Sequence, residues 1–186
     1  PVDVYFLHVQ GSGRMVLPDG TTRHVLYAGT NGLPYVSLGK ELIRMGLSTK
    51  EEMSMQKIRA ILEANPQRQR EFLSMNPKYV FFRVAEYGPL GAAACMLTPH
   101  VSVAVDRRYI PLGAVMVLDG LLPGYQQDLP ERFTGLVLAQ DTGTMREKHV
   151  DLFCGSGPKA AHQAGHLSGR AGLHVLVARE VLSAAP

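Results

Sequence analysis

The hydrophobic period of the chain changes twice, and this constrains the fold more than any single motif. Residues 4–27 alternate apolar and polar side chains, which predicts strands at residues 4–9 and 14–17, a turn at Pro18-Asp19-Gly20, and a third strand through Tyr27. Between residues 36 and 75 the apolar residues recur at helical spacing. From residue 77 onward, short strand-like segments return. Short strands without regular βα alternation favour a small barrel or sandwich over a parallel α/β sheet.

The helical section contains its own start and stop signals. Ser48-Thr49-Lys50-Glu51 has the spacing of a capping box, Asn65 before Pro66 suits a second helix start, and Asn76-Pro77 marks a stop. We expect three helices here, because apolar stripes run through Leu38, Leu42 and Met45, then through Met55, Ile58, Ile61 and Leu62, and then through Phe72 and Leu73.

The second half predicts further strands and one short helix. Strands are indicated by "KYVFFRV", "VSVAV", "GAVMVLDG", "TGLVLAQ", "HVDLFCG" and "GLHVLVARE", and a helix by the run from Pro158 to about Leu167. A Gly/Ala-rich connector, "GPLGAAA", precedes the strand-rich part. We therefore divide the chain into a smaller mixed β/α domain, residues 1–94, and a β-barrel part, residues 95–186.

Composition excludes several classes of function. The chain has 186 residues and a formal net charge of +3, with no block of like charges that would indicate nucleic acid as a partner. Its two cysteines, Cys95 and Cys154, lack metal-ligand spacing, so free thiols are favoured over a zinc site. No apolar run approaches the roughly 20 residues of a membrane span, and the start does not resemble a signal peptide. An exported protein would have lost its signal.

Three aspartates follow or interrupt strand-like segments, where this residue is uncommon. Asp106 follows "VSVAV", Asp141 follows "LVLAQ", and Asp151 lies within "HVDLFC". In a strand, Asp151 and Phe153 share a face, so burial beside the ring would raise the pKa of the carboxyl and suit it to act as an acid. The alternative is that they cap turns, since Asp141 begins "DTG" and Asp106 precedes two arginines.

Other motifs favour structural interpretations. "VQGSGR" lacks the lysine and strand–turn–helix context of a phosphate loop, and His162 and His166, although spaced for zinc, have no third ligand. Cys154 has no evident histidine partner, and "FCGSG" is not the nucleophile elbow of a serine hydrolase. No metal or cofactor is predicted.

A set of blocks covering nearly all of the chain resembles the lytic murein transglycosylase A family, in that family's order. The blocks are "YFLHVQGSGR", "YAGTNGLPYVSLGKELI", "EEMSMQKIRAIL", "NPKYVFFR", "GPLGA", "LTPHVSVAVDRRYIPLG", "LAQDTG" and "VDLFCGSGPKAAHQAG". The resemblance implies a mainly β fold with some α: a double-psi β-barrel, a smaller mixed β/α domain, and a substrate groove between them.

The resemblance also implies a function and a location. The family cleaves the β-1,4 bond between N-acetylmuramic acid and N-acetylglucosamine in peptidoglycan as an exolytic transglycosylase, leaving 1,6-anhydromuramoyl ends. We accordingly expect a monomer that needs no cofactor, binds a glycan strand and no nucleic acid, and works in the periplasm. Its outer-membrane attachment would be an N-terminal lipid anchor that this chain lacks.

The family's functional positions fall on particular residues of this sequence. Asp151 matches the catalytic acid/base, Asp141 its catalytic neighbour, and Asp106 a position on the groove. With less support from the motifs, the sugar-contacting positions match Gln10, Ser12, Tyr27, Thr142 and Gly143. Protonated Asp151 would protonate the glycosidic oxygen and then take a proton from the C6 hydroxyl of the muramic acid, which attacks C1. Two alternatives stay open: a non-catalytic glycan-binding barrel, and an inverting hydrolase in which Asp141 activates water.

The chain also departs from the family pattern. Residues 144–148 replace a longer Gly-Ala-Ile-Lys-Gly-like run, and Cys154 stands where a large aromatic is common. Family members begin with an export signal, a lipid-bearing cysteine and the first portion of the barrel. We therefore expect this barrel to be incomplete at its N-terminal side, with exposed apolar edges unless another segment covers them.

Overall fold

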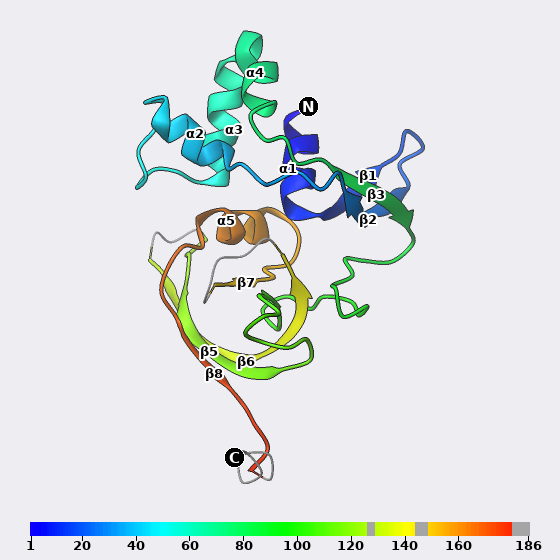
Figure 1. The fold of residues 1–186 in the computed structure, drawn as a ribbon, viewed down its shortest axis with the longest axis vertical. Coiled ribbons are helices and arrows are strands. Elements are labelled where there is room, and N and C mark those ends of the chain that lie inside the picture. Colours follow the sequence, from blue (N-terminus) through cyan, green and yellow to red (C-terminus); the bar gives the residue numbers. More distant parts are fainter. Residues whose placement is uncertain (126–128, 144–148, 180–186) are drawn as a thin grey trace. The chain divides into compact units, whose positions relative to one another are not determined.

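The computed structural model describes residues 1–125, 129–143 and 149–179 of the chain. These residues form two compact units, Pro1–Pro89 and Leu90–Pro186 (Figure 1). Each unit has its own hydrophobic core and is described by itself.

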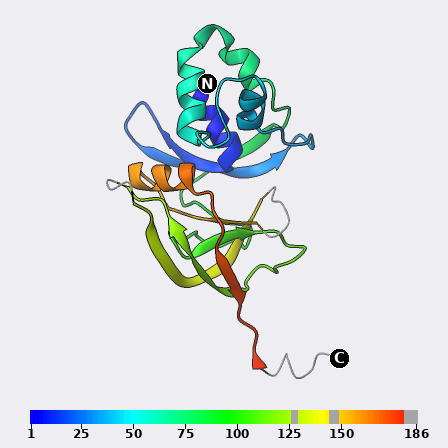
Figure 2. The ribbon, with the colours of Figure 1, turned by 90° about the vertical axis from the view of Figure 1, so that its left-hand side faces the viewer.

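The first unit combines a three-stranded antiparallel sheet with four α-helices. The strands, in spatial order, are β1 (Ser12–Val16), β2 (Thr22–Thr30) and β3 (Val80–Ala85). Figure 2 shows the helices gathered on one face of this sheet. They are α1 (Val2–Gln10), α2 (Leu38–Arg44), α3 (Met55–Ala64) and α4 (Gln69–Leu73), with a 3₁₀ turn, η1 (Pro66–Arg68), before the last.

The predicted strand over residues 4–9 is wrong, because this segment lies in helix α1. Val2, Tyr5 and Phe6 are buried, and their i, i+3, i+4 spacing places them on one helical face against the core of the unit. The helix ends at Gly11, whose φ of 79° is the left-handed conformation that glycine adopts readily. The apparent alternation arose because only part of the apolar set contacts the core.

Two serines start the central helices, and neither belongs to the predicted capping box. Ser37 accepts a hydrogen bond from the Lys40 N–H at the start of α2, and Ser54 accepts one from the Lys57 N–H at the start of α3. Ser48 therefore caps no helix, and that prediction is wrong. The apolar side chains that these helices bury are Leu38, Leu42, Ile61, Leu62 and Phe72.

The second unit is built on a five-stranded sheet that curves into a half-barrel (Figure 1). The strand order is β7 (Val150–Leu152), β4 (Ser102–Val105), β6 (Glu131–Thr142), β5 (Val115–Leu122) and β8 (Gly172–Val175). β4 and β6 run parallel, and the other neighbouring pairs are antiparallel. The core is formed by side chains at alternate positions of these strands, and it includes Val103, Val105, Met116, Val137 and Ala139.

Helix α5 (Pro158–His166) lies between β7 and β8 in the sequence, as predicted. The expectation of a mainly β fold with some α is confirmed at the level of a mixed, sheet-rich structure. The double-psi topology and the groove stay predictions. Within the described ranges, no helix is both long enough and apolar enough to span a bilayer.

Candidate functional site

Strand β4 brings Asp141 and Asp151 into one row of the sheet. Ala104 pairs with Asp141 on β6 in the parallel direction and with Asp151 on β7 in the antiparallel direction. A register shift between Val103 and Ala104 brings Asp141 into the row. The Cα atoms of the two aspartates are therefore two strand spacings apart, about 10 Å. Two residues that lie ten positions apart in the sequence thus flank a single alanine.

Asp141 is the partly buried member of the pair. Its Oδ1 accepts a hydrogen bond from the Ala92 N–H at 3.0 Å. Burial raises the pKa of its carboxyl above the ordinary value, hydrogen bonds from the Thr142 and Ala92 backbone oppose this, and the charge of Asp151 raises it further. The last contribution means that the two carboxyl groups interact electrostatically.

Asp151 is the exposed member of the pair. Its side chain is 67% exposed, and its Oδ1 lies 3.1 Å from Nε2 of His149. The expected burial beside Phe153 is therefore wrong: the strand ends at Leu152, one residue before the ring. The carboxyl group is accessible to a large substrate.

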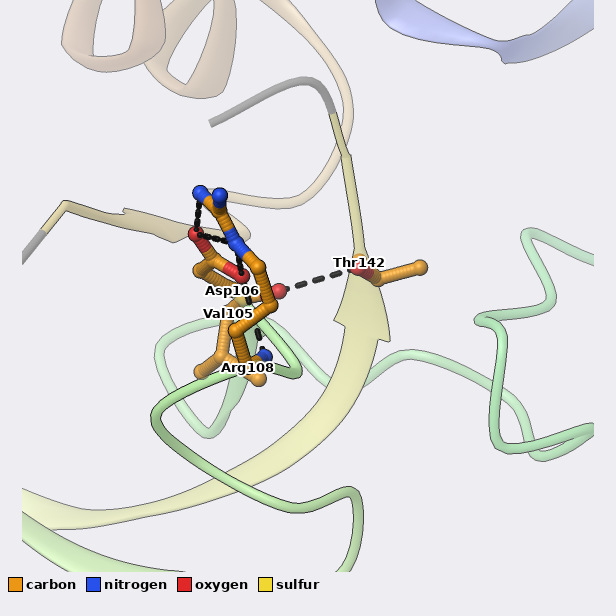
Figure 3. Close-up of polar contacts among 4 residues, drawn as sticks. All are labelled: Val105, Asp106, Arg108 and Thr142. Atoms are coloured by element: carbon orange, nitrogen blue, oxygen red, sulfur yellow. Dashed lines mark hydrogen bonds and ion pairs between the residues drawn. The ribbon is translucent and has the colours of Figure 1, made fainter. Parts of the chain in front are cut away.

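Asp106 is engaged in a turn and an ion pair at the end of β4 (Figure 3). Its carboxylate accepts hydrogen bonds from the backbone N–H and the guanidinium of Arg108, which lower the pKa of this carboxyl, and its side chain is only 12% exposed. This geometry is the turn-capping alternative that the sequence left open. Thr142 lies nearby, and its hydroxyl donates to the carbonyl of Val105 at 2.9 Å.

The predicted sugar contacts of the first unit do not all share one surface. Ser12 pairs with Leu26 across β1 and β2, so alternation places Tyr27 on the opposite face of the sheet. Tyr27 is 54% exposed, and Gln10 is exposed at the last residue of α1. Gly143, in the second unit, is also exposed. Each is accessible, but Ser12 and Tyr27 do not lie side by side.

The remaining chemical candidates are not assembled into a site. Cys154 is buried, its thiol donates weakly to the Leu152 carbonyl, and burial raises the pKa of that thiol. His162 and His166 lie with ring centroids 4.4 Å apart. No group of three or more histidine, cysteine or acidic side chains suited to a metal ion occurs among the described residues. The predicted loop departure at residues 144–148 lies outside the described residues.

Sequence reasoning missed the groups that support Asp141. The backbone N–H of Ala92 contacts the carboxylate, and buried Ser102 donates to the side chain of the adjacent Gln140 while accepting from the Thr98 N–H. The only sequence signal was the Gly/Ala-rich composition of residues 88–94, which permits close backbone approach. His149 was also missed, although it lies two residues before Asp151.

The two halves of the chain match two known domains. Residues 1–83 match the MltA specific insert domain, and residues 101–177 match the 3D domain. Among curated proteins, the chain is 37% identical over 176 residues to the membrane-bound lytic murein transglycosylase A of Vibrio cholerae, and 39% identical over 173 residues to that of Escherichia coli. These alignments cover 89% and 88% of the chain but 46% of each relative. The chain spans about half the length of the curated relatives it matches.

Solved structures agree with this similarity. A membrane-bound lytic murein transglycosylase from Agrobacterium tumefaciens matches with a TM-score of 0.87 and 33% identity, covering 98% of this chain and 51% of that one. Escherichia coli MltA with bound chitohexaose matches with a TM-score of 0.83 and 35% identity, covering 94% of this chain and 53% of that one.

Proposed function

Since the chain belongs to the lytic murein transglycosylase A family, we propose that it contributes the catalytic carboxyl groups of a peptidoglycan lytic transglycosylase. The observation that carries the proposal is the row Asp141–Ala104–Asp151, in which a held carboxyl and an exposed one interact across a single strand. The substrate is the glycan strand, cut between N-acetylmuramic acid and N-acetylglucosamine to give a 1,6-anhydromuramoyl end.

Asp151 acts in this proposal as the acid/base that exchanges protons with the substrate. Its exposed carboxyl gives a proton to the glycosidic oxygen and, as carboxylate, receives one from the C6 hydroxyl that attacks C1. The nucleophile comes from the substrate, so no second carboxylate has to activate water.

Asp141 is a fixed electrostatic partner in the same proposal. Burial and, to a smaller extent, the charge of Asp151 raise the pKa of Asp141, so this carboxyl holds its proton to higher pH than an isolated aspartate would. Asp141 accepts a hydrogen bond from the Ala92 N–H, whereas the exposed Asp151, which lies beside His149, is accessible to the glycan. Asp106, Gln10, Ser12, Tyr27, Thr142 and Gly143 are each proposed to contact the sugar chain, with Asp106 acting through the turn that it holds.

The test is digestion of purified peptidoglycan followed by mass spectrometry of the muropeptides. We expect products that lack the added water of hydrolysis, and we expect Asp151→Asn to abolish them while glycan binding is retained. Asp119→Asn is the matched control, because Asp119 is an aspartate of the same unit that bonds Thr134 and Arg132 instead.

Two other outcomes would identify the alternatives. Products that carry an added water would support an inverting hydrolase, in which two carboxyl groups about 6.5–9.5 Å apart hold a water molecule between them. An unchanged function after Asp151→Asn would support a glycan-binding barrel without chemistry. A periplasmic location, a lipid anchor and a monomeric state belong to the same proposal and are checked by fractionation and light scattering of the intact protein.

A further inference from the structure

A tight loop at the start of the second unit docks on the end of β6. The Gly91 N–H donates to the Cys95 carbonyl at 3.0 Å, and the Ala94 N–H donates to the Gly91 carbonyl at 2.9 Å, so the loop is closed on itself. A bridge between Leu90 and Met96 joins its two ends. The loop therefore has a defined shape of its own.

Two successive N–H groups of this loop bind two successive residues of β6. The Ala92 N–H donates to Oδ1 of Asp141 at 3.0 Å, and the Ala93 N–H donates to the backbone carbonyl of Gln140 at 3.0 Å. The hydrogen bond from Ala93 fixes the loop to the strand, and the Ala92 N–H is thereby directed toward the carboxylate of Asp141. Asp141 is thus held by a backbone donor whose position depends on the loop.

Gly91 is the residue that permits this docking. A Cβ atom at this position would overlap the carbonyl oxygen and carbon of Gln140 and would lie 2.7 Å from a methyl group of Leu97. Since the main obstacle is backbone in a paired strand, the strand cannot yield and the loop would have to move. Any side chain at residue 91 would pull Ala92 away from Asp141.

Gln140 is itself supported from the other side. Its side-chain oxygen accepts a hydrogen bond from the hydroxyl of Ser102, which is fully buried and which accepts in turn from the Thr98 N–H. The loop therefore binds a residue whose side chain and backbone are both fixed. Such support is what keeps a reactive carboxyl in one orientation.

We propose that the Gly91–Ala92 peptide segment is a positioning element for the reaction. The Ala92 N–H holds one carboxyl oxygen of Asp141, and this constraint leaves the other oxygen directed toward the substrate. The inference rests on the proposed function for its effect on catalysis. Its structural part, the dependence of the Asp141 carboxyl on residue 91, is measurable without any turnover.

The first measurement uses the unmodified protein. In NMR spectra recorded through a pH titration of the intact protein, the Ala92 amide should shift with the ionisation of Asp141, because it donates to that carboxylate. The Ala94 amide of the same loop donates to Gly91 and should not follow that ionisation. An Ala92 amide that is insensitive to Asp141 would overturn the proposal.

The second measurement compares Gly91→Ala with Ala94→Gly. In Gly91→Ala we expect the pKa of Asp141 to rise, because a hydrogen bond to the charged form is lost, and kcat to fall by about 10- to 100-fold with little change in KM. Ala94 has a φ of 58°, which glycine adopts without strain, so Ala94→Gly should keep the pKa and stay within about 2-fold of the original kcat.

A double-mutant comparison separates positioning from general damage. In an Asp141→Ala background, Gly91→Ala should cause no further loss, since its effect passes through the carboxyl. An equal loss in both backgrounds, or an unchanged Asp141 pKa, would contradict the proposal. If the unmodified protein produced no anhydromuropeptides, the proposed function would fail, and the NMR results would still decide whether the loop positions Asp141.

Discussion

Asp141 and Asp151 look alike in the sequence, since each adjoins a strand-like segment, yet their surroundings differ. The sequence indicates that both are unusual for strands but contains no information on what approaches them. The Ala92 N–H comes from a loop nearly fifty residues away, and backbone donors leave no trace in side-chain chemistry. The exposure of Asp151 was likewise unpredictable, because it depends on where β7 ends.

The raised pKa of Asp141 predicts how its replacement alters stability with pH. A group whose pKa is raised by folding favours the folded state below its unfolded pKa, near 3.8, and that contribution is lost as pH rises through the folded pKa. Asn cannot ionise and still accepts from Ala92. Asp141→Asn should therefore match the original protein near pH 3 and melt about 1–3 °C higher near pH 7, with water screening limiting the gain.

Thermal unfolding followed by circular dichroism at both pH values checks this prediction. Asp141→Leu is the control, because it removes both the charge and the acceptor for the Ala92 N–H and should lower the melting temperature. A melting temperature for Asp141→Asn that falls below that of the original protein as pH rises would refute the sign of the pKa shift.

At the scale of elements, the period of apolar residues predicted most of the helices and strands correctly. It succeeded for α3 and α5 and for the strands of the second unit, where one face of each element is buried. It failed for α1, because a nine-residue helix shows too few turns to distinguish a period of 3.6 from one of 2. The predicted capping box at Ser48 was misplaced because Ser48, Thr49 and Ser54 all precede α3 and are all suitable N-cap residues.

The two serines near α3 give a matched pair of substitutions. Ser54 accepts from the Lys57 N–H at 3.1 Å, so Ser54→Ala should cost about 1 kcal/mol of unfolding free energy. The hydroxyl of Ser48 is buried and has no hydrogen-bond partner among the described residues, so Ser48→Ala should be neutral or stabilising. Urea denaturation of both variants measures the two changes. An equal loss of unfolding free energy in Ser54→Ala and Ser48→Ala would contradict the assignment of Ser54 as the N-cap of α3.

At the scale of the whole molecule, the chain contains two separate cores. One is formed by α1–α4, and the other by the half-barrel. The change of period indicated a helical and a strand-rich part, because a core of helical stripes and a core of alternating strands have different signatures, and the domain boundary at residue 94 stays a prediction. The strand order, with β4 between β6 and β7, depends on pairings between distant segments and could not be read from local pattern.

Because the two cores are separate, a cavity created in one of them should increase hydrogen exchange mainly in its own unit. Leu42 and Met116 are both fully buried, one in each core, and replacing either with alanine should cost about 2–5 kcal/mol. Leu42→Ala should increase hydrogen exchange chiefly in residues 1–89, and Met116→Ala chiefly in residues 90–179. Exchange that increases uniformly over both units in each variant would show that the two cores unfold as one.

The alanine between the two aspartates has a consequence for how this sheet can vary among related sequences. The distance between the carboxyl-bearing residues is set by the pairing of β6 and β7 with their common neighbour β4. Sequence changes outside β4, β6 and β7 can therefore leave the spacing of Asp141 and Asp151 constant, because the pairing of those strands fixes it. Under the proposed function, the preference for one glycan over another can thus vary independently of the pair of aspartates.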